Sequence, residues 1–272
     1  MGQLSRLPGS AAYHRAIVAA KKVVYGRHGE PITLGNHTLR YVPGTRPARL
    51  RHANSRDETV RNDVRQIQYI LATVGEGNFV IDVGSNAGQY TVLFAALTGP
   101  KGRVIAFEPA SAARAILREN LGLNGFENRV YIEPFALSDI AGQHRFYERG
   151  ADTMASLERA GFGNDSSAPD IGESIIETVT LDDYLAKQGR AAPNLVKIDT
   201  EGAEIKVLRG ATDTLRGAVR FVCELHPYAW DAFGTSYSEL LDIVRAGGKS
   251  IRYLDTERRI EDGPVYGAVV ID

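Results

Sequence analysis

The sequence predicts a doubly wound α/β domain, which is a parallel sheet with helices on both faces. From Asn78 onward, short apolar runs alternate with amphipathic helical patterns. The runs are nearly continuous in Val and Ile, as is typical of parallel strands that are buried on both sides. The chain has 272 residues, of which 43% are hydrophobic and 24% are charged. This composition is typical of a globular protein of one large or two small domains and excludes disordered and collagen-like chains.

Residues 1–60 are predicted to form an extension that precedes this domain. An amphipathic pattern predicts a helix over residues 11–25, and the alternation in ITLGNHTLRYVPG around Gly35 and Asn36 predicts a β-hairpin. A further helix is expected over residues 58–74. It would cover the sheet with an apolar face formed by Val60, Val64, Ile67, Ile70 and Leu71.

Residues 61–272 are predicted to form the main domain, with an insertion around residues 140–180. Strands are expected in NFVIDVG, GRVIAFEP, RVYIEPFALSD, NLVKIDT and VRFVCELHP, and helices in ARAILRENLGLNG, EIKVLRGATDTL and YSELLDIVRAGG. The final segments SIRYLD and VYGAVVID predict an antiparallel pair of strands. Within the insertion, HRFYER and IIETVTLDDYL predict extra strands. They flank a polar, Gly-rich segment, residues 159–174, that is either a mobile binding element or disordered.

The balanced charge argues against a nucleic-acid partner, and the cysteine content indicates a reducing compartment. Lys and Arg total 32 against 33 Asp and Glu, so no global positive field points to nucleic acid or an anionic membrane, although a local patch is compatible with these totals. The single cysteine, Cys223, lies in an apolar run where a buried, inert thiol is expected. No apolar stretch approaches the roughly 18 residues of a membrane helix, and the first residues lack a secretory leader. We therefore expect a cytoplasmic protein without stable membrane insertion.

The turn after the first strand of the main domain predicts a ligand site. In VIDVGSNAGQY the strand ends at Asp82 and a helix begins near Gln89, which is the geometry that points helix N–H groups at a ligand. A dinucleotide fingerprint needs G-x-G-x-x-G, but its middle glycine is replaced by Asn86 and its last by Gln89. Asp82 would repel a pyrophosphate and would pair with the ammonium group of an amino acid. The contacts expected here come from Asp82, Gly84, Ser85, Asn86, Gly88 and Tyr90.

The ends of the next two strands extend the predicted pocket. Glu108 follows Gly88 by 20 residues, at the position where an acid can accept both hydroxyls of a ribose. The third strand end, FALSD, would lie beside an adenine and offer apolar contacts and a polar acceptor. An amino acid, a ribose and an adenine are combined in S-adenosylmethionine, the predicted cofactor. The contacts expected here come from Glu108, Pro109, Ala136, Leu137, and Ser138 or Asp139. The alternative is that these acids only cap turns.

Four segments of the sequence resemble the FkbM family of S-adenosylmethionine-dependent O-methyltransferases. They are VIDVGSNAGQYT, AFEP, ALSD and, most specifically, VKIDTEGAEIKVLRGA, within residues 79–227. The resemblance implies a class I methyltransferase (Rossmann-like) fold, with a seven-stranded, mostly parallel sheet. It also implies methylation of a hydroxyl group, often on a sugar or a polyketide-derived metabolite, so a small-molecule or oligosaccharide acceptor is expected. Residues 1–60 and 151–174 lie outside the firm match, and acceptor specificity is expected there.

Acids at the fourth and fifth strand ends predict how the acceptor is activated. An alcohol with a pKa of roughly 15 to 16 is a poor nucleophile, so the site needs a base or a metal ion. KIDTEGAE places Asp199 at a strand end and Glu201 just after it, and CELHP adds Glu224 and His226. Because side chains alternate along a strand, Glu224 and His226 are predicted to share a side. Asp199, Glu224 and His226 could then hold Mg²⁺, or an acid could orient His226 as a base.

Several alternatives stay open at this point. The base is expected to be His226 or His144, with Glu201 third, and the acids of KIDTEGAE could only stabilise the dipole of a helix. An NAD-dependent oxidoreductase would use Glu108 for the ribose, but it leaves Asp82 unexplained. A non-catalytic binding protein with a methyltransferase fold is the third possibility. A homodimer is expected if the N-terminal helix packs across a two-fold axis through its apolar residues Ile17, Val18, Val23 and Val24.

Overall fold

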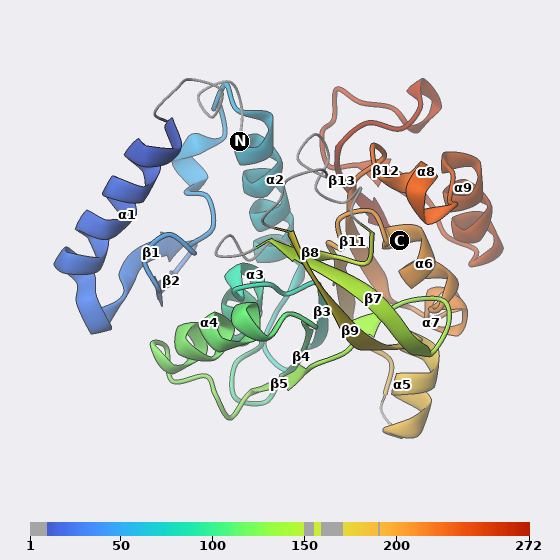
Figure 1. Cartoon of the computed structure of the whole chain (residues 1–272). Helices are drawn as coiled ribbons and strands as arrows, with labels where there is room; N and C mark the ends of the chain where they lie inside the picture. The colour runs from blue at the N-terminus through green and yellow to red at the C-terminus, as the bar shows by residue number, and fades with distance from the viewer. Residues whose placement is uncertain (1–9, 150–154, 159–170, 190) are drawn as a thin grey trace.

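A seven-stranded sheet forms the centre of the molecule (Figure 1). The computed structural model describes residues 10–149, 155–158, 171–189 and 191–272. The strand order is β12, β13, β11, β10, β3, β4, β5, and β13 runs antiparallel to both of its neighbours. This confirms the predicted class I methyltransferase sheet with its antiparallel final pair. The strands are β3 (Phe79–Val83), β4 (Arg103–Phe107), β5 (Val130–Glu133), β10 (Leu195–Ile198), β11 (Arg220–Leu225), β12 (Ile251–Tyr253) and β13 (Gly267–Ile271).

Helices cover both faces of this sheet, as the continuous apolar strands predict. On one face Val80 and Val222 pack under α2 (Glu58–Thr73), α3 (Gln89–Thr98) and α4 (Ser111–Gly122). On the other, Ile81 and the buried Cys223 pack under five further helices. These are α5 (Leu181–Lys187), α6 (Glu204–Arg209), α7 (Thr212–Arg216), α8 (Trp230–Phe233) and α9 (Tyr237–Ala246). Each face of the sheet therefore has an apolar core of its own.

The helix α2 confirms the predicted covering helix. The Asp57 side chain caps it by accepting a hydrogen bond from the backbone N–H of Thr59 at 3.0 Å. Its apolar face buries Val64, Ile67 and Ile70, while Val60 and Leu71 are partly exposed. The boundary expected after residue 60 would fall inside this helix. Because the whole helix belongs with the sheet that it covers, we propose that the main domain begins at Asp57.

The segment EIKVLRGATDTL forms two helices, so the prediction of one continuous helix was wrong. The helix α6 ends at Arg209, and α7 begins at Thr212. Gly210 between them passes so close to the carbonyl oxygen of Ser138 that a Cβ atom on it would lie 2.1 Å away. This contact with the loop at Ser138 coincides with the end of α6, and the sequence pattern of the helix gives no sign of it.

The N-terminal extension contains the predicted helix and hairpin. The helix α1 (Ser10–Tyr25) stands at the left of Figure 1, followed by η2 (Gly26–His28), β1 (Glu30–Leu34), β2 (His37–Tyr41) and η3 (Leu50–His52). The hairpin β1–β2 is fixed to the domain, because the Tyr41 hydroxyl donates to the carbonyl of Gln89 at 2.9 Å. The backbone N–H of Val42 donates to the Asn120 side chain at 2.6 Å. In contrast, α1 contacts the body of the molecule through few side chains.

The predicted insertion forms a separate small sheet that crosses the front of Figure 1. Its strand order is β6 (Ala136–Leu137), β9 (Ile171–Val179), β7 (Gly142–Arg149) and β8 (Ala155–Ser156). HRFYER and the first half of IIETVTLDDYL are thus confirmed as the strands β7 and β9, which pair antiparallel. The second half, LDDYL, was wrongly predicted as strand: Thr180 caps a helix there, and the segment forms the start of α5. Most of the Gly-rich segment, residues 159–170, lies outside the described residues. Because β6 follows β5 directly, the small sheet is attached at the carboxyl end of the central strands.

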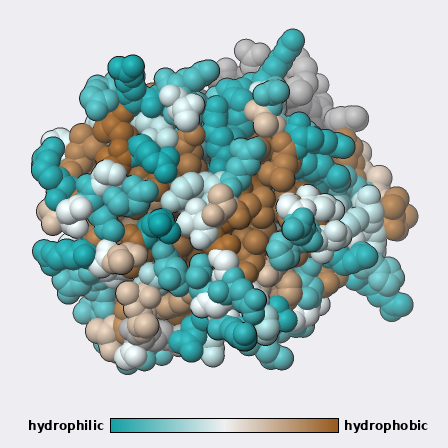
Figure 2. Space-filling model, turned by 180° about the vertical axis from the view of Figure 1, so that it is seen from behind, coloured by the Kyte–Doolittle hydropathy of each residue, from teal (hydrophilic) through white to brown (hydrophobic). Residues whose placement is uncertain are grey.

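The face seen in Figure 2 is mostly hydrophilic, with apolar side chains between polar ones. Among the described helices, none has the length and apolar character to cross a bilayer. Large exposed apolar side chains include Val23 and Val24 on α1, and Ile140 and Ile175 in and beside the small sheet.

Gly84 connects β3 to the turn after it, and replacing it is expected to damage the fold. Its φ is +74°, and a Cβ atom there would lie 1.9 Å from the carbonyl oxygen of Asp199. We expect Gly84→Ala to lower the free energy of unfolding by about 2 to 5 kcal/mol, measured from the denaturant midpoint. The matched control is Gly125→Ala, with a similar φ of +68° but open space around it, where the loss should be about 1 to 2 kcal/mol. Equal losses would contradict the steric argument.

Candidate active site

A cavity opens at the carboxyl ends of β3, β4 and β10, with about 900 Å³ of empty space when its open mouth is included. It is bounded on one side by Phe146 and Leu157 of the insertion. Both expected groups of residues meet here, because Asp199 and Glu201 line the same cavity as the expected cofactor contacts. The expected cofactor contacts that line it are Asp82, Gly84, Ser85, Asn86, Tyr90, Glu108, Pro109, Ala136 and Leu137.

Gly88 and Ser138 are not among the lining residues, and the structure gives them other roles. Gly88 caps α3 with a φ of +83°, and a Cβ atom on it would lie 2.3 Å from the side chain of Leu117. It therefore allows α3 and α4 to pack closely. The Ser138 hydroxyl donates to Asp139 at 3.1 Å, and Asp139 forms an ion pair with Arg209 at 2.6 Å. The geometry thus does not support Ser138 or Asp139 as the acceptor for an adenine amine.

Two buried polar atoms beside the cavity lack partners among the described residues. One is Oδ1 of Asp82, whose other oxygen accepts a hydrogen bond from the Thr91 hydroxyl at 2.5 Å. The other is the hydroxyl oxygen of Ser85. A buried polar group without a partner costs about 1 to 3 kcal/mol. Burial raises the pKa of Asp82, while the nearby Lys197 opposes this. A carboxylate and a hydroxyl in this arrangement fit the ammonium and carboxylate groups of an amino acid.

Glu108 holds the turn after β3 in place. One of its carboxylate oxygens accepts from the backbone N–H of Asn86 at 2.7 Å, and the other from that of Ala110 at 2.8 Å. Asn86 has a positive φ of +49°, so this bond supports an unusual backbone conformation. Each oxygen keeps a lone pair that can accept from a ribose hydroxyl. Burial raises the pKa of Glu108 to about 7, although the two backbone hydrogen bonds oppose the shift.

Lys197 connects the two halves of the site. Its side chain is 1% exposed, and its Nζ donates to Asp199 at 3.0 Å and lies 4.4 Å from the centre of the Tyr90 ring. The Tyr90 hydroxyl in turn donates to Asp63 at 2.9 Å. Although burial disfavours the charged amine, Asp199 and Asp82 raise the pKa of Lys197 to about 12. The neighbouring carboxylates therefore favour a charged ammonium group between the first and fourth strand ends.

Asp199, Glu201 and His226 form the candidate catalytic cluster. His226 Nε2 lies 3.9 Å from Asp199 Oδ1 and 3.6 Å from Glu201 Oε2. One possible ligand atom from each of the three residues lies within 4.8 Å of the others, so the cluster could hold a metal ion. Despite burial, Lys197 and His226 lower the pKa of Asp199.

Glu224 is separate from this cluster, so its prediction as a metal ligand is not supported. Its carboxylate accepts hydrogen bonds from the Gln66 side chain, at 2.8 Å, and from the Tyr266 hydroxyl. Gln66 lies on α2, so Glu224 faces that side of the sheet. His226 follows Leu225, the last residue of β11, and strand alternation no longer fixes its direction there.

Glu204 is a site residue whose role the sequence did not reveal. It is fully buried, and its oxygens bind His226 Nδ1 at 2.9 Å, the Trp230 Nε1–H at 3.0 Å and the Gly202 N–H at 2.7 Å. These contacts fix the imidazole with Nε2 facing the cluster. Although burial opposes the charge, Glu201 and Glu204 raise the pKa of His226 well above its usual value. These neighbouring carboxylates therefore favour the protonated form of the imidazole, which argues against His226 as the base.

Glu201 presents its carboxylate to the cavity from a strained turn. Its φ is +52°, and Asn86 is the other non-glycine residue with a positive φ among those described. Strained backbone of this kind gathers at functional sites. The Tyr228 hydroxyl donates to its Oε2 at 3.0 Å. Burial, and to a smaller degree Asp199, raise the pKa of Glu201 to about 7.

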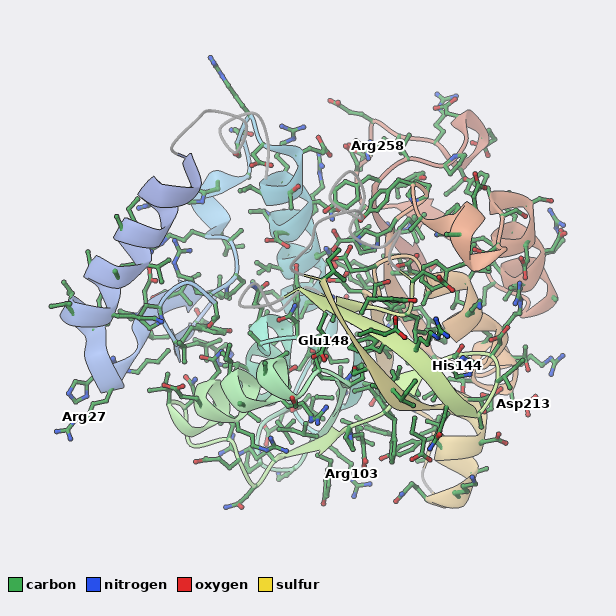
Figure 3. The ribbon with its side chains drawn as sticks, in the orientation of Figure 1. Arg27, Arg103, His144, Glu148, Asp213 and Arg258 are labelled. Carbon is green, nitrogen blue, oxygen red and sulfur yellow. The ribbon has the colours of Figure 1, made fainter. Side chains whose placement is uncertain are left out.

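His144, the other expected base, is not brought to the site. It lies on β7 of the small sheet with an exposed side chain, and it is absent from the residues that line the cavity (Figure 3). The sequence placed it near the cofactor because it closely follows ALSD. The small sheet instead turns Phe146, two residues further along, into the cavity wall.

Comparison with known proteins agrees with this geometry. The profile of the methyltransferase FkbM domain matches residues 82–251, so the chain belongs to the FkbM family of S-adenosylmethionine-dependent methyltransferases. It is 35% identical over 199 residues to 31-O-demethyl-FK506 methyltransferase FkbM of Streptomyces tacrolimicus, covering 64% of this chain and 74% of that protein. It is 26% identical over 179 residues to the hexuronic acid methyltransferase AglP of Haloferax volcanii, covering 61% and 64%.

Among solved structures, the chain resembles a methyltransferase FkbM from Methylobacillus flagellatus with a TM-score of 0.45. The two share 14% sequence identity, and the alignment covers 79% of this chain and 55% of that one.

Ionisation of Glu108 should control cofactor binding. Because its pKa is about 7 and the carboxylate is the form that accepts ribose hydroxyls, affinity should rise with pH. We expect S-adenosylhomocysteine to bind about tenfold more tightly at pH 8 than at pH 6, measured by isothermal titration. Glu108→Gln should bind weakly at both values, and any pH dependence left in it would report on the other acids of the cavity, Asp82 and Glu201. The same affinity at both pH values in the wild type would contradict the assignment.

Proposed function

We propose that this chain is a cytoplasmic S-adenosylmethionine-dependent O-methyltransferase that methylates a hydroxyl group of a saccharide or glycosylated metabolite. The observation that carries the proposal is the single cavity that joins the unpaired atoms of Asp82 and Ser85 to the carboxylates of Asp199 and Glu201. The name of the Haloferax volcanii relative, a hexuronic acid methyltransferase, supports a saccharide acceptor. The free, buried Cys223 fits a reducing compartment.

The cofactor would lie along the ends of the first three strands. Asp82 and Ser85 would bind its amino-acid end, and Glu108 would accept its ribose hydroxyls. Apolar side chains of Phe107, Pro109 and Leu137, which line the cavity, would contact the adenine. When bound, S-adenosylmethionine supplies a methyl group on a sulfonium centre and leaves as the neutral thioether.

Glu201 is the proposed base. It lines the cavity, and among the described residues a hydrogen bond reaches only Oε2 of its two carboxylate oxygens. As the bond from the acceptor oxygen to the methyl carbon forms, the hydroxyl proton would pass to Glu201. Asp199, held by Lys197, would orient the acceptor hydroxyl. His226, fixed by Glu204, is proposed as a positioning group for both carboxylates, and we propose no role for His144.

Mg²⁺ is proposed as a second ligand of the same cluster. Asp199 and Glu201 supply the oxygen donors that this ion prefers, and His226 supplies a nitrogen. The ion would act as a Lewis acid toward the acceptor oxygen. Because Glu224 is engaged by Gln66 and Tyr266, we propose the set Asp199, Glu201 and His226 in place of the one that includes Glu224.

The base assignment predicts a selective loss of turnover. With S-adenosylmethionine and a panel of saccharides that includes hexuronic acids, Glu201→Gln should lower S-adenosylhomocysteine formation by about 10²-fold or more. Its affinity for S-adenosylhomocysteine should stay near that of the wild type. The control, His144→Asn, should keep full turnover. Full turnover in Glu201→Gln would refute the base role. Cofactor binding without turnover on any acceptor would favour a binding protein, and binding of NAD instead would favour an oxidoreductase.

The metal assignment predicts which acid Mg²⁺ needs. Titration of Mg²⁺ into the protein saturated with S-adenosylhomocysteine should give a binding isotherm that Glu201→Gln weakens at least tenfold. Glu224→Gln is the matched control, because it removes a nearby buried carboxylate outside the cluster, and it should bind Mg²⁺ like the wild type. If the wild type shows no binding, or if Glu224→Gln is the variant that loses it, this set of ligands is wrong.

A further inference from the structure

The N-terminal part of the chain carries a charge opposite to that of the rest. Residues 1–56 contain ten Lys and Arg and a single acid, Glu30, whereas residues 57–272 contain 22 Lys and Arg and 32 Asp and Glu. Glu30 is already paired, at 2.9 Å with Lys21 and at 2.7 Å with Arg46. The net charge of −1 therefore conceals a basic N-terminal region on an acidic body.

The helix α1 contacts its own chain through one narrow face. Val18, Lys21 and Tyr25, spaced as neighbours on a helix surface, are partly buried. Val18 packs against Gly44, and Lys21 pairs with Glu30. All the remaining residues of the helix from Ala16 onward are exposed. The helix is thus attached along one side only, which agrees with its position at the edge of the molecule in Figure 1.

An apolar stripe runs along another side of α1. It consists of Ala16, Ile17, Ala20, Val23 and Val24, which the 3.6-residue period places together. Val23 is 86% exposed and Val24 is 73% exposed, unusually high values for residues of this type. In Figure 2, apolar side chains protrude at the right-hand edge, which is where α1 lies in that view. The part of the chain that the structure describes therefore leaves the stripe uncovered.

The charges around the stripe indicate what covers it. α1 contains three Lys and Arg and no acid. Lys22 is exposed and has no ion pair among the described residues, and Arg27 extends into solvent beyond the end of the helix (Figure 3). A surface that is apolar within and negatively charged at its boundary complements these features, and an anionic lipid leaflet has both. A symmetric pair of these helices would instead bring together two elements that carry only positive charge.

We propose that α1 docks this protein on an anionic membrane surface. The helix would lie in the plane of the interface, with Ile17, Val23 and Val24 among the upper acyl chains. Lys22 and Arg27 would contact the phosphate and carboxylate headgroups. This is reversible surface binding and not insertion, and it does not depend on the proposed methyltransferase activity.

Co-sedimentation of the full chain with vesicles tests the proposal. The wild type should bind vesicles of phosphatidylcholine mixed with phosphatidylserine, bind vesicles of phosphatidylcholine alone at least about tenfold more weakly, and dissociate as salt is raised. The double variant Val23→Ser, Val24→Ser and the variant Lys22→Glu should each lose about tenfold or more of the binding to mixed vesicles. Titration with S-adenosylhomocysteine should show that these variants keep the cofactor site of the wild type.

The matched control replaces apolar residues of similar exposure elsewhere. Ile140 and Ile175 are 63% and 61% exposed at the small sheet, and the double variant Ile140→Ser, Ile175→Ser should bind vesicles like the wild type. Equal binding to both vesicle types, or the same loss in the control, would overturn the proposal. So would a dimer in light scattering that dissociates on Val23→Ser, Val24→Ser, or binding of RNA or DNA that Lys22→Glu abolishes while vesicles are not bound.

Discussion

The rest of the site depends on the interaction between the buried ammonium group of Lys197 and the carboxylates around it. Asp199, Asp82 and Glu224 all act on it electrostatically, and it directly contacts Asp199 and the ring of Tyr90. Carboxylates so close together in a buried region would repel each other and take up protons without a cation between them. Lys197 therefore allows one edge of the sheet to present acids both to the expected cofactor and to the candidate catalytic cluster. It achieves this from the middle of β10, where a sequence pattern alone shows only one charge in an apolar run.

The sequence predicts the fold well because the strands are buried on both sides. Nearly continuous apolar runs predict the strands β3, β4, β10 and β11. The polar residues after each run predict where the strand ends. The predicted cofactor side is consistent with the structure for the same reason: Asp82 and Glu108 end their strands, and a parallel sheet brings such ends to one edge. A local sequence pattern is sufficient to predict a strand and the residues at its end wherever the backbone is regular.

Predictions fail where the backbone leaves its regular path. His226 lies one residue beyond β11, so alternation could not show that it joins Glu201 while Glu224 turns to α2. Glu201 reaches the cavity through a positive φ that no propensity would assign to a glutamate. Gly88 and Gly210 are glycines because of their contacts with Leu117 and Ser138, which are remote in sequence. In each case a tertiary contact decides the outcome, and one sequence does not contain it.

The small sheet of β6, β9, β7 and β8 has a further consequence. It hydrogen-bonds within itself, and Phe146 of β7 and Leu157 just after β8 line the cavity, whereas the turns after β3 and β4 supply other parts of the lining. The part of the small sheet after β6 is therefore a separate unit of the chain from these turns, and it can change in shape while the turns keep their contacts. An exchange of the insertion between relatives would alter what enters the cavity without disturbing Asp82 or Glu108. This division allows the acceptor side of the cavity to vary among proteins of this fold while the cofactor side stays the same.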